Sequence, residues 1–233
     1  MTAPADPLVS ILVPVYNEER FLEQVLRKVH AAPFNKEIVV VDDGSADGTK
    51  RILADLAPAL SLRVLTHARN QGKGRAVRTA IEASRGTILL IQDADLEYDP
   101  GDYPALLKPL LEGRASVVYG SRFLGAHPAS YLLHRVGNWT ITMFVNLLFS
   151  ASLTDVETGY KAFRRELVAA LPLRAMSFEF EVEVTCKLLR LGPVIVEVPV
   201  SYYGRTYAEG KKITWKDGVY ALWVILCCRL NVW

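Results

Sequence analysis

Short apolar runs alternate with segments of helical spacing through the first half of the chain. The runs are rich in β-branched residues, as buried parallel strands are, and between them apolar residues recur every three to four positions. We therefore expect strands at 8–15, 37–41, 62–65, 87–91 and 115–119, and helices at 18–30, 49–56, 74–84 and 103–111. Alternating strands and helices with short links form a mostly parallel sheet covered by helices on both faces, so the pattern predicts an α/β fold.

The second half of the chain is more helical and less regular. We expect helices at 131–150, 164–171 and 179–191, a strand at 194–200 and a last helix from about 214. No repeat or linker interrupts the sequence, so we expect a single domain over residues 1–233 with a C-terminal helical part. The uncharged segment 136–154 is too polar to span a membrane with confidence. It is either a core helix or a helix lying in a membrane interface.

Polar side chains gather where the expected strands end. They occur at 16–18, 42–48, 92–97 and 120–122. Ligands of open α/β sheets bind at the carboxyl ends of the strands, so these four segments should line one crevice. Three of the four carry carboxylates, which repel one another unless a divalent metal, an Arg or a Lys lies among them.

The segment Asp93-Ala94-Asp95 gives the most specific indication of chemistry among these four segments. Two carboxylates at positions i and i+2 after a strand can bind one hard cation, with Glu97 as a third oxygen ligand, and Mg²⁺ or Mn²⁺ would keep positions open for a diphosphate. The alternative is a solvated turn. The strongly apolar strand before it favours the metal site.

Two further segments each allow two interpretations. In Asp42-Asp43-Gly44-Ser45 a carboxylate can accept a hydrogen bond from a base N–H, or the segment is a turn that caps the next helix, and both roles can hold together. The glycine-rich basic loop 70–75 lacks the P-loop pattern, so it either approaches a phosphate through backbone N–H groups or is an ordinary loop and helix cap.

Composition narrows the class of protein. Hydrophobic residues make up 51% and charged residues 22%, which suits a packed core. With 27 Lys and Arg against 25 Asp and Glu, the net charge of +2 excludes a basic nucleic-acid footprint over the whole surface. Three cysteines cannot close a disulfide framework and no secretory signal is visible, so we expect a reducing, cytoplasmic compartment.

Taken together, these motifs resemble family 2 glycosyltransferases of the GT-A fold, most of all the polyprenyl-phosphate and dolichyl-phosphate sugar synthases. Six segments match in order along almost the whole chain: Val13 to Glu19, Val41 to Thr49, Asp93 to Leu96, Gly120 to Arg122, Gly159 to Arg164, and Arg205 with Lys211. One such motif would be weak, but six in order are specific.

The resemblance implies a role for each matching residue. Residues 1–125 would form the half that binds the nucleotide sugar and residues 126–233 the acceptor side. The base and ribose would lie against Pro14, Tyr16, Glu18, Val41 and Asp43, and the donor site would include Asp93 and Ala94. Asp95 and Glu97 would bind the metal, and Arg122, Arg205 and Lys211 would hold the phosphates, with Arg135 near the acceptor phosphate.

The resemblance also implies an inverting, metal-dependent transfer from GDP-mannose or a UDP-hexose to a lipid phosphate. Such an acceptor is already anionic and needs no base, whereas a hydroxyl acceptor would need one, with Asp155, Glu157 or Glu181 as candidates. The alternatives are a family 2 enzyme that acts on a glycan or small-molecule hydroxyl, and a binding module without catalysis. A peripheral position at the cytoplasmic face of a membrane, with a membrane partner protein or a second copy, is the expected setting.

Overall fold

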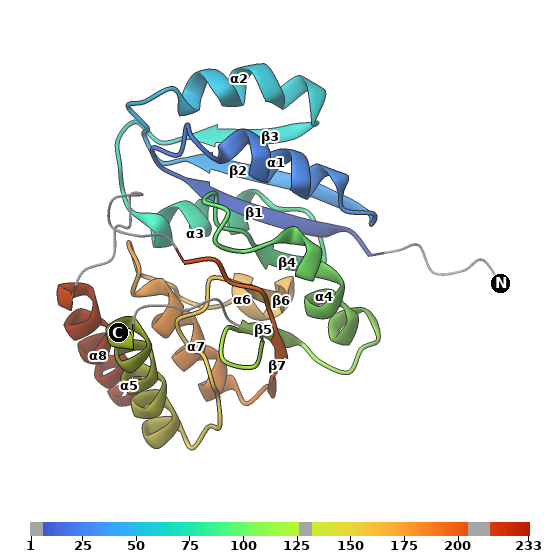
Figure 1. The fold of residues 1–233 in the computed structure, drawn as a ribbon. Helices are drawn as coiled ribbons and strands as arrows, with labels where there is room; N and C mark the ends of the chain where they lie inside the picture. The colour runs from blue at the N-terminus through green and yellow to red at the C-terminus, as the bar shows by residue number, and fades with distance from the viewer. Residues whose placement is uncertain (1–6, 126–131, 205–214) are drawn as a thin grey trace.

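The computed structural model describes residues 7–125, 132–204 and 215–233. Its centre is a seven-stranded sheet in the order β3-β2-β1-β4-β6-β5-β7 (Figure 1). The strands are β1 (Val9–Val15), β2 (Lys36–Asp42), β3 (Leu62–Thr66), β4 (Ile88–Ile91), β5 (Val117–Ser121), β6 (Lys161–Arg164) and β7 (Ile195–Pro199). Only β6 runs antiparallel to its neighbours, β4 and β5. The predicted mostly parallel sheet is confirmed.

Helices cover both faces of the sheet because strand residues alternate between two apolar cores. On β1, Ile11 and Val13 pack with α1 (Leu22–Ala31), α2 (Thr49–Ala59) and α4 (Tyr103–Leu111), which follows the short helix η1 (Pro100–Asp102). Leu12 points to the other face and packs with α3 (Lys73–Ala83), α6 (Arg165–Ala169) and α7 (Phe180–Leu191). β1 is buried along its whole length, which explains its unbroken apolar sequence.

A third layer lies outside α7. It consists of α5 (Leu132–Phe149) and α8 (Trp215–Leu230), which pack on each other and on α7 through an apolar cluster that includes Val145, Val182 and Val224. The two helices lie side by side at the lower left of Figure 1. Neither these helices nor any other described helix combines the length and apolar character that crossing a membrane requires.

Two predicted helix boundaries need correction, and one strand was missed. The helix expected at 18–30 begins at Leu22, because the Glu18 N–H donates to Thr49 Oγ1 (3.0 Å) and the preceding Asn17 has a φ of 52°. The helix expected at 164–171 is shortened to Arg165–Ala169. Strand β6 was not predicted, because its four residues, Lys-Ala-Phe-Arg, are half charged and too few to show an alternating pattern.

Candidate active site

The antiparallel strand β6 lies between β4 and β5, so its first residues share an edge with the carboxyl ends of those two strands. The Gly120 N–H donates to the Tyr160 oxygen at 2.8 Å. A Cβ on Gly159 would collide with Asp93 Oδ2, so a larger residue where the chain enters β6 would displace the Asp93 carboxylate. The segment before β6, residues 153–160, is thereby placed beside the polar end of β4.

Asp43, at the end of β2, fixes the loop that leads into α3. Its Oδ1 contacts His67 Nδ1 (2.6 Å) and accepts from the Gln71 N–H (2.9 Å), and its Oδ2 accepts from the Gly72 N–H (2.7 Å). Two further N–H groups, at Gly74 and Arg75, donate to backbone oxygens of Ser177 and Met176. These four N–H groups donate within the protein, which favours the loop-and-cap interpretation of 70–75.

A buried charge cluster lies beneath the end of β4. Lys73 Nζ contacts Asp93 Oδ1 (2.7 Å) and Glu181 Oε1 (3.1 Å), and Lys161 Nζ contacts Glu181 Oε2 (2.6 Å). Burial disfavours the charged form of both lysines. The two carboxylates outweigh this effect at Lys73 and raise its pKa, whereas burial dominates at Lys161 and lowers its pKa. Glu181 therefore forms ion pairs with two lysines. The sequence interpretation had it as a candidate base and assigned no role to Lys161, whose only signal was its place in the matching segment 159–164.

The turn after β4 brings Asp95 and Glu97 together. Leu96 between them has a φ of 61°, and the Glu97 N–H donates to Asp95 Oδ1 (3.1 Å). Tyr202 donates its hydroxyl proton to Glu97 Oε2 at 2.8 Å, which ties this turn to the chain that follows β7. Carboxylate oxygens suit Mg²⁺ or Mn²⁺. Within the described ranges no three His, Cys, Asp or Glu side chains converge on a ready metal cage, so a cation here would take further oxygens from its ligand.

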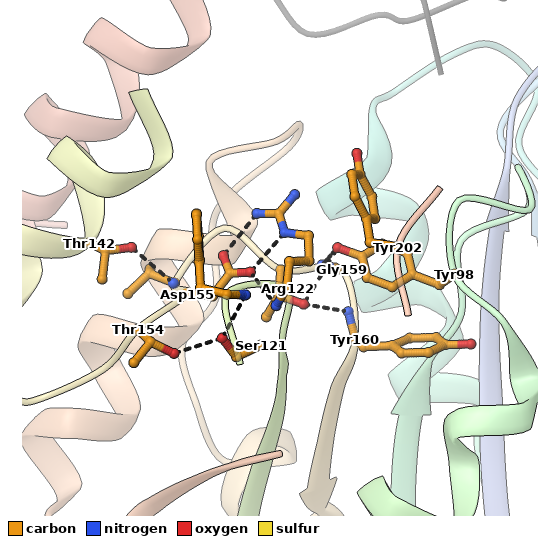
Figure 2. Close-up of polar contacts among 12 residues, drawn as sticks. Tyr98, Ser121, Arg122, Thr142, Thr154, Asp155, Gly159, Tyr160 and Tyr202 are labelled. Atoms are coloured by element: carbon orange, nitrogen blue, oxygen red, sulfur yellow. Dashed lines mark hydrogen bonds and ion pairs between the residues drawn. The ribbon is translucent and has the colours of Figure 1, made fainter. Parts of the chain in front are cut away.

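Arg122, directly after β5, is held by Asp155 in a two-pronged ion pair (Figure 2). Its Nε donates to Asp155 Oδ2 (2.7 Å), its Nη2 to Oδ1 (2.8 Å) and its backbone N–H to Oδ2 (3.0 Å). The guanidinium lies over the Tyr202 ring, 5.1 Å from its centre. Burial lowers the pKa of Arg122, but Asp155 outweighs it and keeps the guanidinium charged.

Asp155 is in turn fixed by two neighbouring elements. Glu197 of β7 accepts from the Asp155 N–H (2.9 Å) and the Thr154 N–H (2.8 Å), and Thr142 of α5 accepts from the Val156 N–H (3.2 Å). Figure 2 shows Thr142, Thr154 and Ser121 around the ion pair. The position of Arg122 thus depends on β5, β7 and α5 together, which no local sequence motif reveals.

The Asp155→Asn variant should lose stability because it leaves the Arg122 charge without its carboxylate. Asp155 is fully buried, and breaking a pair of this kind costs about 3 kcal/mol of unfolding free energy. Urea unfolding measures the loss. The matched control is Glu23→Gln, which removes an exposed pair with Arg27 and should cost under about 1 kcal/mol. Equal stabilities for the two variants would contradict the prediction.

Glu157 is the other titratable group of this segment. Its Oε1 is shielded from solvent without a hydrogen-bond partner among the described residues. Burial raises its pKa to about 7, and the Glu181 carboxylate adds to the rise against Lys161 and Arg122. The folded protein therefore binds a proton that the unfolded chain has released above pH 4.5, the ordinary value for this side chain.

Stability should accordingly fall between pH 4.5 and about 7, and the full penalty should persist above that range. Glu157→Gln removes the charge, so the variant should gain on the order of 2–3 kcal/mol relative to the wild type from pH 5 to pH 8. Urea unfolding of both proteins across this range, with the exposed Glu82→Gln as control, tests it. Parallel stability curves for wild type and Glu157→Gln would refute the assignment.

The remaining predicted residues fall in two groups. Pro14 and Val41 pair in register on β1 and β2, and Glu18 is buried just after β1. Tyr16 follows β1 directly, and Ala94 is buried within the turn after β4. Arg205 and Lys211 lie outside the described residues. The structure thus joins the ends of β2, β4 and β5 through Asp43, Gly72, Lys73, Asp93 and Gly159, as the shared-edge argument predicted.

The family model for glycosyl transferase family 2 matches residues 10–171. The chain belongs to this family. An undecaprenyl-phosphate mannosyltransferase of Micrococcus luteus is 32% identical over 87% of this chain and 86% of its own length. Glycosyltransferase AglJ of Haloferax volcanii is 31% identical over 87% of this chain, which spans 65% of that protein. The resemblance to polyprenyl-phosphate sugar synthases is confirmed.

A solved structure shares the fold of this family 2 glycosyltransferase. It is glucosyl-3-phosphoglycerate synthase from Mycobacterium tuberculosis, in complex with Mn²⁺, uridine diphosphate and glucosyl-3-phosphoglycerate. The TM-score is 0.71 at 22% identity, over 98% of this chain and 81% of the other. The predicted GT-A architecture is therefore confirmed.

Proposed function

We propose that the protein transfers a sugar from GDP-mannose or a UDP-hexose to a polyprenyl or dolichyl phosphate, with inversion at the anomeric carbon. The observation that carries this proposal is the Arg122–Asp155 ion pair and its link to the turn of Asp95 and Glu97 through Tyr202, whose ring lies under the guanidinium and whose hydroxyl donates to Glu97. A fixed cation and the two carboxylates proposed to bind the metal thus share one edge of the sheet. The name of the Micrococcus luteus relative supports a lipid-phosphate acceptor.

The donor would bind across the ends of β1, β2 and β4. The base and ribose would contact Pro14, Tyr16, Glu18, Val41 and Asp43. The rest of the donor site would be lined by Asp93 and Ala94. Arg122, Arg205 and Lys211 would neutralise the diphosphate, since planar guanidinium groups bind phosphate through paired hydrogen bonds.

Asp95 and Glu97 would hold Mg²⁺ or Mn²⁺, as the hard oxygen donors of this turn fit such a cation. When bound, the cation stabilises charge that develops on the leaving diphosphate. The Mn²⁺ and UDP in the glucosyl-3-phosphoglycerate synthase structure support a divalent cation beside a nucleotide diphosphate. The turn positions the two carboxylates, and the Tyr202 hydroxyl orients Glu97.

The acceptor argument follows from how the candidate bases are used. Both Asp155 oxygens bind Arg122, and both Glu181 oxygens contact lysines, so neither is suited to take a proton. An acceptor phosphate oxygen is already anionic. It would attack the anomeric carbon from the face opposite the diphosphate, forming the new C–O bond as the bond to the diphosphate oxygen breaks. Asp155 then acts by positioning Arg122.

A hydroxyl acceptor is the second candidate, and Glu157 is the observation that favours it. A carboxyl group with a pKa of about 7 is well matched to general-base catalysis near neutral pH. The two functions differ in the acceptor they require and in whether Glu157 matters for the rate.

The test offers two acceptors that differ only in the phosphate. Purified protein with GDP-mannose or UDP-glucose and Mn²⁺ or Mg²⁺ receives either a short-chain polyprenyl phosphate or the matching polyprenol. Mass spectrometry should find a glycosylated lipid phosphate and no glycosylated alcohol, EDTA should abolish the product, and Glu157→Gln should keep most of the rate. Transfer to the alcohol alone would establish the hydroxyl reaction instead, and donor binding without transfer or hydrolysis would indicate a binding module.

A further inference from the structure

Lys161, the first residue of β6, places an amino group in the core of the protein. Its side chain is fully buried, and its Nζ contacts Glu181 Oε2 (2.6 Å) and donates to the backbone oxygens of Val156 (2.9 Å) and Thr158. The same atom lies over the Tyr119 ring, 4.7 Å from its centre. Three acceptors match the three protons of an ammonium group, so the bonds of Lys161 have a fixed set of directions.

Two of these three acceptors belong to the segment that holds Arg122. Val156 follows Asp155 directly, and the Asp155 carboxylate accepts from Arg122 Nε (2.7 Å) and Nη2 (2.8 Å), as Figure 2 shows. Thr158 lies three residues after Asp155 and ends the same turn. The backbone that positions the Arg122 guanidinium is therefore bonded to Lys161 at two points.

The third acceptor of Lys161 leads to the proposed donor side. Glu181 Oε1 contacts Lys73 Nζ (3.1 Å), and Lys73 Nζ contacts Asp93 Oδ1 (2.7 Å). The other Asp93 oxygen lies against Gly159, where an added Cβ would approach it to 2.3 Å. The Asp93 carboxylate thus lies between a lysine of α3 and the segment that Lys161 holds.

Stability of the core does not by itself call for a lysine at this position. Replacing a buried ion pair by apolar residues of similar volume is often neutral or stabilising. An apolar side chain cannot, however, donate to two backbone oxygens and a carboxylate at the same time. What Lys161 adds is a directed link between the segment of Asp155 and the carboxylate of Glu181.

We propose that Lys161 is a positioning residue for sugar transfer, which fixes the place of Arg122 relative to Asp93. It acts through the turn 156–158 on one side and through two successive ion pairs on the other, and its full burial keeps it from touching donor or acceptor. The inference rests on the proposed function, in which Arg122 neutralises phosphate and Asp93 lines the donor site.

Helix α7 provides a matched control, a buried lysine without this link. Lys187 Nζ contacts Glu183 Oε1 (2.6 Å) and donates to the backbone oxygen of Pro172 (2.6 Å). Like Lys161, it joins a carboxylate of α7 to a backbone oxygen, but its oxygen belongs to the segment after α6 and not to the turn 156–158. Lys187→Met therefore removes a comparable buried ion pair away from Arg122.

Initial rates of transfer to a short-chain polyprenyl phosphate test the proposal. The wild type and both lysine variants are assayed with Mn²⁺ and GDP-mannose or UDP-glucose, at a temperature at which circular dichroism shows each protein to be folded. Lys161→Met should lower kcat by about 10²-fold, because small displacements of reacting groups have effects of this size. Lys187→Met should lose stability but keep a kcat near that of the wild type.

The double variant Glu181→Gln/Lys161→Met separates positioning from stability. It should be more stable than Glu181→Gln because the buried ammonium group is gone. It should nevertheless turn over as slowly as Lys161→Met, since the oxygens of the turn 156–158 still lack their donor. A rate that recovers together with stability would overturn the proposal, as would equal rates for Lys161→Met and Lys187→Met.

Hydrogen exchange of the resting protein supplies a readout that needs no reaction. N–H groups between residues 153 and 160 are hydrogen-bonded in the wild type, so they should exchange slowly. Mass spectrometry should find faster exchange in this segment for Lys161→Met and not for Lys187→Met. Unchanged exchange in Lys161→Met would overturn the positioning proposal. Faster exchange there, with a wild type that transfers no sugar to the lipid phosphate, would support the link and refute the proposed function alone.

Discussion

Replacing Asp95 by Asn should lower kcat/KM for sugar transfer by about 10²–10³-fold and leave the fold intact. The substitution removes one negative charge from the pair proposed to hold the cation, and a metal ion contributes several kcal/mol to stabilising transition-state charge. The Asp95 oxygen that accepts from the Glu97 N–H has an equivalent in the asparagine amide oxygen, so the turn should keep its shape. Initial rates over a range of Mn²⁺ concentrations should show that the variant needs more Mn²⁺ to reach half of its maximal rate. Its maximal rate should also be lower.

Asp99 provides a matched control for this experiment. It is also a turn carboxylate, accepts a hydrogen bond from the Gly101 N–H (2.9 Å) and lies outside the proposed metal pair. Asp99→Asn should retain nearly the full rate. If Asp95→Asn turned over as fast as the wild type at every metal concentration, Asp95 would have no part in metal binding.

Replacing Glu181 by Gln should produce the largest loss of stability of any single charge removal considered. Glu181 contacts Lys73 and the fully buried Lys161. Its loss leaves Lys161 without its carboxylate partner, and burial, which already lowers the pKa of Lys161, then acts unopposed by that carboxylate against a charged ammonium group. Removing one partner of a buried ion pair costs about 3–5 kcal/mol. For a protein of this size that corresponds to a fall in Tm of roughly 10 °C, which thermal and urea unfolding can both measure.

Two further variants show whether the stranded charge is the cause. Glu82→Gln removes a carboxylate 3.5 Å from Arg75 on the surface and should cost under about 1 kcal/mol. The double variant Glu181→Gln/Lys161→Met removes both charges and should recover part of the lost stability, since an apolar replacement needs no partner. If the double variant were instead less stable than Glu181→Gln, the loss of stability in the single variant would be due to disturbed packing and not to the unpaired charge.

The sequence predicted structure correctly where the pattern within one short segment is enough to determine its conformation and burial. The apolar run of β1 predicted a strand buried on both faces, and the structure buries every one of its residues. The polar residues that follow β2, β4 and β5 predicted a shared edge, because parallel strands end on the same side of a sheet. Strand β6 escaped prediction because its polarity reflects a neighbour far along the chain: the buried Lys161 pairs with Glu181 and also donates to the backbone oxygens of Val156 and Thr158.

The same limit applies to individual side chains. Asp43 and Asp93 were recognised as carboxylates at strand ends, but the sequence did not show that Asp43 would fix the loop at Gly72 or that Asp93 would contact Lys73. Asp155 was considered as a base, and its commitment to Arg122 became visible only in three dimensions.

By itself, the sequence determined the alternating α/β architecture, the family resemblance and the residue types at each strand end, because apolar periodicity and short motifs are local properties. Tertiary structure alone decided which charges meet. Glu181 joins Lys73 to Lys161, and Asp155 binds Arg122. Such pairings form between residues distant in the chain, because burial makes an unpaired charge costly and folding brings a partner of opposite charge within reach.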